Sequence, residues 1–171
     1  MAVGQFPEAL KEVMQRNGVT LAKVGQVAHV DLSQISKIVR RTRKASKQVM
    51  KSTATHYDDA QLLLAAAADV TGGASVPWLD NVDLHPSTTH IKTIEEIQEA
   101  LQALLTLPIT KSPEQLTDKD RANIKNGLME QLEAITALTH NAAALCRKYE
   151  FSYIALWSEH REELKFKKYM K

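Results

Sequence analysis

The residues best suited to chemistry in this chain lie between Asp31 and Asp58, an interval without any Asp or Glu. Its seven basic residues are Lys37, Arg40, Arg41, Arg43, Lys44, Lys47 and Lys51. Arg and Lys donate charge-assisted hydrogen bonds to anionic oxygens, and Lys also suits the acceptor atoms O6 and N7 of guanine. The chemistry that this pattern offers is non-covalent binding of a phosphate-bearing polymer.

The positive charge is local, because the whole chain has 22 basic and 20 acidic residues. Residues 1–71 have ten basic and six acidic side chains, a net charge of +4, whereas residues 72–171 have twelve and fourteen, a net charge of −2. Such a band suits phosphate contact on an otherwise neutral protein. A membrane surface or a calmodulin-like partner is the competing interpretation, and the sparse apolar residues of this segment disfavour it.

Two short helices joined by a tight turn are expected to position these side chains. Thr20 is a suitable N-cap for a helix over residues 21–28. Asp31 is a suitable N-cap for a second helix over residues 32–39. Its negative charge interacts favourably with the positive N-terminal end of the helix dipole. Gly25 lies inside the first helix, where Gly costs roughly 0.5–1 kcal/mol relative to Ala. We therefore expect the second helix to approach the backbone closely at Gly25.

The second helix has distinct inner and outer faces. Ile35 and Ile38 are three residues apart and should face the core, which leaves Leu32, Ser33, Ser36 and Lys37 outward. An outer face that is small, polar and basic can approach base edges without electrostatic repulsion. Further helices are expected over residues 6–16, 47–57 and 59–70.

Residues 6–45 resemble the lambda-repressor and Cro-like helix-turn-helix family, often called XRE-like, as found in regulators of Gram-positive bacteria and their prophages. The residues that carry the resemblance are Thr20, Gly25, Val30 and the run Ile35-Ser36-Lys37-Ile38. The resemblance implies an all-α protein with an N-terminal five-helix domain, whose recognition helix at about 32–39 lies in the DNA major groove.

The resemblance also implies a set of contact residues. Those facing bases would be Leu32, Ser33, Gln34, Ser36 and Lys37. Those contacting phosphates would be Thr20, Arg40, Arg41, Arg43, Lys44 and Lys47. Two positions depart from the family pattern. Leu21 stands where the family usually has a phosphate-binding Gln, and His29 stands where its turn usually has Gly. His29 must therefore accept an unfavourable backbone angle, or the turn must be of a different type.

The rest of the chain predicts a linker and a helical region. The expected organisation is a DNA-binding domain over residues 1–71, a loop or linker over residues 72–91 and a helical C-terminal domain over residues 92–171. Thr93 and Glu96 have the spacing of a capping box. Apolar residues recur at helical spacing in two segments. They are Ile94, Ile97, Leu101, Leu104 and Leu105, and then Ile124, Leu128, Leu132, Ile135, Leu138 and Leu145.

Two uses of these apolar residues remain open at this stage. A long amphipathic helix beside a shorter one can form a homodimer interface, which operator-reading proteins commonly need. The same residues can instead pack a helical hairpin within one chain. The basic and aromatic C-terminus, residues 165–171, is similarly open: it is either a second nucleic-acid contact or a cap over the core with extended lysines.

Other features limit the function classes. Cys146 is the single cysteine and is expected to be a small core residue of a cytoplasmic or nucleoid-associated bacterial protein. The N-terminus lacks the basic start and apolar run of a signal peptide. Asp80, Asp83 and His85 are expected to cap turns rather than to bind a metal. We expect no cofactor, no metal and no membrane partner, and no enzymatic activity, because no catalytic motif is recognisable.

The sequence therefore predicts a dimeric, sequence-specific double-stranded DNA-binding transcriptional regulator, of repressor and phage or prophage type. The alternative is a protein-interaction module, for example a phage adaptor or antirepressor, that uses the helix-turn-helix shape without specific DNA binding. The operator, the direction of regulation and any inducer do not follow from the sequence.

Overall fold

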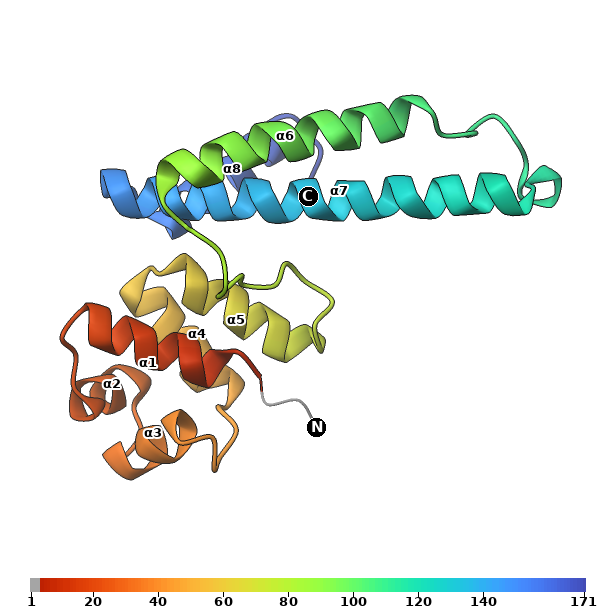
Figure 1. The fold of residues 1–171 in the computed structure, drawn as a ribbon. Helices are drawn as coiled ribbons and strands as arrows, with labels where there is room; N and C mark the ends of the chain where they lie inside the picture. Colours follow the sequence, from red (N-terminus) through yellow and green to blue (C-terminus); the bar gives the residue numbers. More distant parts are fainter. Residues whose placement is uncertain (1–3) are drawn as a thin grey trace. The chain divides into compact units, whose positions relative to one another are not determined.

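The protein is all-helical over the residues that its computed structural model describes, residues 4–171, and no strand occurs among them (Figure 1). The all-α class is confirmed. The helices are α1 (Phe6–Arg16), α2 (Leu21–Ala28), α3 (Leu32–Val39), α4 (Lys47–Tyr57), α5 (Ala60–Thr71), α6 (Pro86–Leu105), the short 3₁₀ helix η1 (Pro113–Gln115), α7 (Asp118–Tyr149) and α8 (Tyr153–Phe166). No helix in this part of the chain combines the length and apolar character needed to span a bilayer.

The chain forms two compact units, which we describe separately. The first unit contains the chain as far as Leu79 together with Tyr149–Lys171, and the second unit is Asp80–Lys148. Residues 149–171 thus group with the N-terminal helices and not with the rest of the expected range 92–171. One tie is a hydrogen bond of 2.9 Å from the Ile154 backbone amide to Asp58 Oδ1.

The first unit has one apolar core beneath α1 to α5. Its largest fully buried apolar side chains are Phe6, Leu10 and Val13 of α1, Val24 of α2, Ile35 and Ile38 of α3, and Leu62 of α5. Burial of side chains of this size contributes about 1.5–3 kcal/mol each. The core therefore fixes α2 and α3 against the other three helices, and it holds the inner face of α3.

The helix starts in the first unit agree closely with the predicted ones. The hydroxyl of Thr20 accepts a hydrogen bond from the Lys23 amide at 3.3 Å, which confirms Thr20 as a cap. Asp59 caps α5 in the same way through the Leu62 amide at 3.2 Å. Asp31 occupies the N-cap position of α3, but its side chain makes no capping hydrogen bond. Asp31 therefore has the position and the charge expected of a cap, but it does not make the capping hydrogen bond.

The segment after α5 packs on the first unit through Trp78, which is buried. The Gln5 side chain pairs with the Trp78 backbone, donating from Nε2 to the carbonyl at 3.2 Å and accepting from the amide at 3.3 Å. This reciprocal pair satisfies both backbone groups of Trp78. It explains how a loop without regular structure is held in place.

In the second unit, α6 begins earlier than the sequence suggested. The helix starts at Pro86, with His85 as N-cap, so the predicted capping box at Thr93 is wrong. Pro fits the first helical turn because its missing amide has no helical partner there. Thr93 is instead buried within the helix, where its hydroxyl donates to the carbonyls of Thr89 at 2.7 Å and Ala137 at 3.0 Å. Inside a helix, a Thr hydroxyl can donate its hydrogen bond to a backbone carbonyl of the preceding turn. The capping pattern in the sequence therefore fits a helix interior as well as a helix start.

The polar residues before α6 act as turn caps. Asp83 accepts hydrogen bonds from the His85 amide at 2.9 Å and from the Thr88 hydroxyl at 2.7 Å. The imidazole Nδ1 of His85 accepts from the Ser87 amide at 3.3 Å. These bonds agree with the capping role expected for Asp83 and His85.

The helices α6 and α7 run antiparallel along one another (Figure 1), and their buried residues are small or polar. Those on α6 are Thr89, Thr93, Glu96 and Ala100, and those on α7 include Gly127, Ala134, His140, Ala143 and Cys146. The burial of Cys146 confirms the sequence expectation. Most of the long apolar residues of both helices are 42–71% exposed, whereas Ile124 and Leu145 are half-buried. Packing of the hairpin within one chain therefore covers these side chains only in part.

Candidate nucleic-acid interface

The turn between α2 and α3 is built from backbone hydrogen bonds. The His29 amide donates to the Gln26 carbonyl at 3.2 Å, and the Val30 amide donates to the Gly25 carbonyl at 2.9 Å. His29 has φ 54° and ψ 43°, the left-handed conformation. This is the Schellman arrangement, in which the left-handed position is usually Gly. Of the two alternatives at His29, the structure has the unfavourable backbone angle, and His is among the residues that tolerate it best.

Gly25 leaves room for the turn. A Cβ atom at this position would lie 2.7 Å from the Val30 carbonyl oxygen, closer than real Cβ contacts allow. The expected close approach is confirmed, although the nearest atom belongs to the turn and not to helix α3. Since the contact is with backbone, no rotamer change of a neighbouring side chain can relieve it.

Replacing Gly25 with Ala is expected to destabilise the first unit by about 1–3 kcal/mol, the usual cost of overpacking. The higher helix propensity of Ala offsets part of this cost. Chemical denaturation followed by circular dichroism measures the change. Gly72→Ala does not test a contact, because the space around Gly72 is open and an alanine there would be strained only by the positive φ. Ala22→Gly is the matched control, because it changes helix propensity at an exposed position of α2 without adding a contact. A Gly25→Ala protein as stable as the wild type would contradict the close contact.

Helix α3 presents three of the five predicted base-facing residues to solvent. Leu32 is 51% exposed, and Ser33 and Lys37 are also exposed. Gln34 and Ser36 are half-buried at the edges of this surface. Ile35 and Ile38 point into the core, as predicted. Ser33 and Lys37 are four residues apart and lie on one face of the helix.

The end of α3 is held by a second turn of the same type. The Arg41 amide donates to the Ile38 carbonyl at 2.8 Å and the Thr42 amide to the Lys37 carbonyl at 2.9 Å. Arg41 takes the left-handed position, with φ 61°. The Thr42 hydroxyl also donates to the Lys37 carbonyl at 3.1 Å. These bonds fix where the basic loop leaves the helix.

Arg41 also pairs with an acidic residue of α1. Its guanidinium donates to Glu8 Oε2 at 3.0 Å, and both side chains are exposed. Desolvation alone would raise the pKa of Glu8, but hydrogen bonds and charges from Lys11 and Arg41 outweigh it and lower that pKa. Arg41 therefore helps to hold the loop against α1. The sequence analysis assigned it only to phosphate contact and missed this pairing.

The other predicted phosphate residues are exposed around the same surface. Arg40 and Arg43 leave the end of α3 and make no ion pair with any residue of the described range 4–171. Lys44 is exposed in the loop, and Lys47 is exposed in the first turn of α4. Thr20 is exposed at the start of α2, where its hydroxyl is used for capping. The structure thus brings together the short helix, its basic loop and the start of α4.

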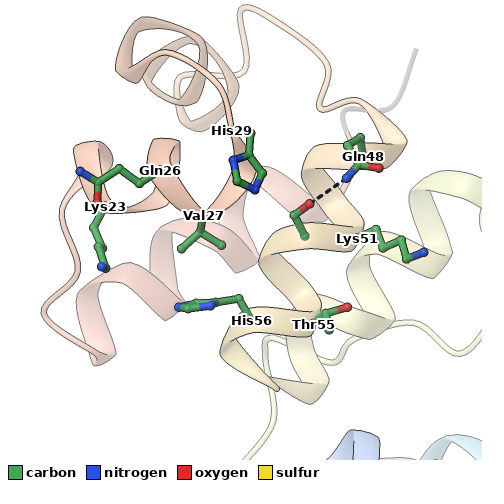
Figure 2. A pocket seen from close by; sticks show the side chains of 9 residues that line it. Lys23, Gln26, Val27, His29, Gln48, Lys51, Thr55 and His56 are labelled. Atoms are coloured by element: carbon green, nitrogen blue, oxygen red, sulfur yellow. Dashed lines mark hydrogen bonds between the residues drawn. The ribbon is translucent and has the colours of Figure 1, made fainter.

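An open hollow of about 550 Å³ lies between α2 and α4 (Figure 2). Its lining residues are Lys23, Gln26, Val27, His29, Gln48, Lys51, Ser52, Thr55 and His56. None of these side chains is acidic. The Gln48 amide donates to the Ser52 hydroxyl at 3.1 Å, and the rings of His29 and His56 come from opposite walls. The hollow extends the acid-free surface to the side of the turn. The sequence analysis did not single it out, because its residues are scattered over two helices.

Comparison with protein-family models, with curated proteins and with solved structures found no match for this chain.

Proposed function

We propose that this protein is a sequence-specific double-stranded DNA-binding transcriptional regulator of the XRE-like helix-turn-helix family. One observation carries the proposal: helix α3 is fixed on its inner face by Ile35 and Ile38, while its outer face presents Ser33 and Lys37 beside an acid-free basic loop. A short exposed helix of this kind fits the major groove of B-form DNA. The five helices α1 to α5 form the DNA-binding domain in this proposal.

The exposed residues have complementary tasks in the proposed complex. Lys37 donates to guanine O6 or N7, Ser33 hydrogen-bonds a base edge, and Leu32 contacts a thymine methyl group. Gln34 and Ser36 lie beside them. The phosphate contacts come from Thr20, Arg40, Arg41, Arg43, Lys44 and Lys47, which fix the register of the protein on the duplex. No catalytic residue and no cofactor is part of this proposal.

The second unit supplies the proposed dimer interface. We call the exposed residues Ile94, Ile97, Leu101 and Leu104 of α6 and Leu128, Leu132, Ile135 and Leu138 of α7 the apolar stripes. Spacings of three and four residues keep each stripe on one side of its helix. In each helix the stripe residues directly follow buried residues, as Leu101 follows Ala100 and Ile135 follows Ala134. Because the two helices are antiparallel, this common offset of one residue, about 100° around each helix, directs both stripes to the same face of the hairpin. A second copy of the chain has the same face and can cover it as a four-helix bundle.

In vitro selection from random duplex DNA at near-physiological salt tests the proposed function. The expected result is one enriched motif arranged as an inverted repeat, since two copies of α3 would read two half-sites. Binding that enriches no sequence and disappears as salt rises would show charge attraction alone and would overturn the proposal.

A protein-interaction module is the second candidate function, and the exposed apolar stripes favour it as an alternative. In that case the stripes bind a different protein, and α3 has no sequence preference on DNA. A phage adaptor or antirepressor has these properties. Strong selection of one operator sequence would eliminate this candidate.

A further inference from the structure

We propose that Glu96, Glu130 and Glu133 in the second unit bind one hard divalent cation, of the class of Ca²⁺, Mg²⁺ or Mn²⁺. Glu96 lies on α6, and Glu130 and Glu133 lie on α7. This site goes beyond the proposed DNA-binding function and is independent of it. None of its residues belongs to the first unit.

The three carboxylates converge on one point. Each offers one oxygen, and these oxygens lie within 4.8 Å of one another. Glu130 and Glu133 are three residues apart and therefore neighbours on one face of α7. Two ligand oxygens on opposite sides of a Ca²⁺ ion are about 4.6–5.2 Å apart, since each Ca–O bond is about 2.3–2.6 Å. The upper limit of 4.8 Å therefore allows all three oxygens to coordinate one ion of this class.

Glu96 provides a second, independent observation. Its side chain is only 9% exposed, and its Oε2 atom has no hydrogen-bond partner within the described residues. The other oxygen, Oε1, pairs with Lys92 Nζ at 2.7 Å, so only one of the two oxygens is satisfied. A buried carboxylate oxygen without a partner is costly. A cation held with Glu130 and Glu133 would satisfy Oε2 and would also offset the repulsion among three carboxylates.

The surroundings favour a hard cation over a soft one. An open hollow beside the site is lined by side chains with oxygen donors, including Glu95, Glu99, Gln102 and Asn126, and by Glu130 itself. No His or Cys lines this hollow. Carboxylate, amide and water oxygens suit Mg²⁺, Ca²⁺ and Mn²⁺, whereas Zn²⁺ and Cu²⁺ select imidazole or thiolate ligands. The open side leaves room for water molecules to complete the coordination shell.

Titration of the full-length protein with Mn²⁺, followed by the electron paramagnetic resonance signal of the free ion, tests the site. The wild type is expected to bind one Mn²⁺ per chain, and Ca²⁺ should compete for it. The variants Glu130→Gln and Glu133→Gln are expected to bind Mn²⁺ about tenfold or more weakly, since weakening even an outer-shell partner of a metal ligand costs that much. Both are exposed or half-exposed positions at which Gln keeps the side-chain shape.

Glu99→Gln is the matched control, because it removes the same charge from α6 next to the site but outside the triad. Its affinity for Mn²⁺ should remain within about twofold of the wild type, as expected for a screened charge in water. Saturable binding to the wild type that weakens equally in all three variants would show only diffuse attraction, and would overturn the proposal. Absence of stoichiometric Mn²⁺ binding would also overturn it. Neither result bears on DNA binding, which the selection experiment measures separately.

Discussion

The variant Leu132→Asp is expected to be monomeric and to bind the selected inverted-repeat operator about 100-fold or more weakly than the wild type. Leu132 is 57% exposed and lies in the middle of the α7 apolar stripe. Burying a carboxylate in an apolar dimer interface requires its desolvation, which is strongly unfavourable without a paired charge. Loss of the dimer separates the two copies of α3, and each half-site then binds without the effective concentration that the partner provides.

Sedimentation velocity at micromolar concentration measures the oligomeric state, and fluorescence anisotropy measures operator binding. Asn126→Asp is the control, because it adds the same charge to α7 at a position that lines the hollow next to the acidic site and not the apolar stripe. Its dimer should resemble that of the wild type. A monomeric wild type, or a Leu132→Asp protein that still dimerises, would contradict the proposed interface. Circular dichroism checks that both variants are folded.

Lys37→Ala and Arg40→Ala are expected to weaken DNA binding in two different ways. Lys37 is proposed to contact a base, so its removal should cost about 1–3 kcal/mol at the preferred operator and relax the preference at one base-pair position. Arg40 is proposed to contact a phosphate, so its removal should weaken binding to all sequences alike. It should also reduce the slope of log affinity against log salt by about one unit.

Affinities for the operator and for point-substituted operators, each measured over a range of salt concentrations, separate these two effects. Lys125→Ala is the control, because this lysine is exposed on α7, outside the first unit. It should leave both affinity and salt slope unchanged. If the Lys37 and Arg40 variants both bound DNA as the wild type does, the recognition-helix assignment would be wrong.

The local elements of the first unit could be predicted from the sequence because their signals are short-range. The capping by Thr20 and the apolar spacing of Ile35 and Ile38 each act within one helical turn. The bounds of α3, Leu32–Val39, agree with the predicted residues 32–39. His29 was likewise recognisable as strained, because its position in the turn requires a left-handed backbone.

The features that the sequence could not supply depend on residues far apart in the chain. Glu8 and Arg41 are 33 residues apart, and no pattern pairs them. Glu96 likewise meets Glu130 and Glu133 only because α6 and α7 run side by side. The early start of α6 was missed for a different reason. A Thr three residues before a Glu fits both a helix start and a helix interior, and only the tertiary contact with the Ala137 carbonyl decides between them.

The two Schellman turns that bracket α3 have a consequence for how this protein can change during evolution. Both turns are made by backbone amides and carbonyls, and the inner face of the helix depends on Ile35 and Ile38. The placement of α3 therefore does not depend on the side chains of Ser33 and Lys37. In the proposed DNA complex, substitutions at these outward positions would alter which sequence is recognised at almost no cost in folding stability. In this proposal, the residues that fold the first unit differ from the residues that select the DNA sequence. Single mutations at the outward positions would therefore give new sequence specificities.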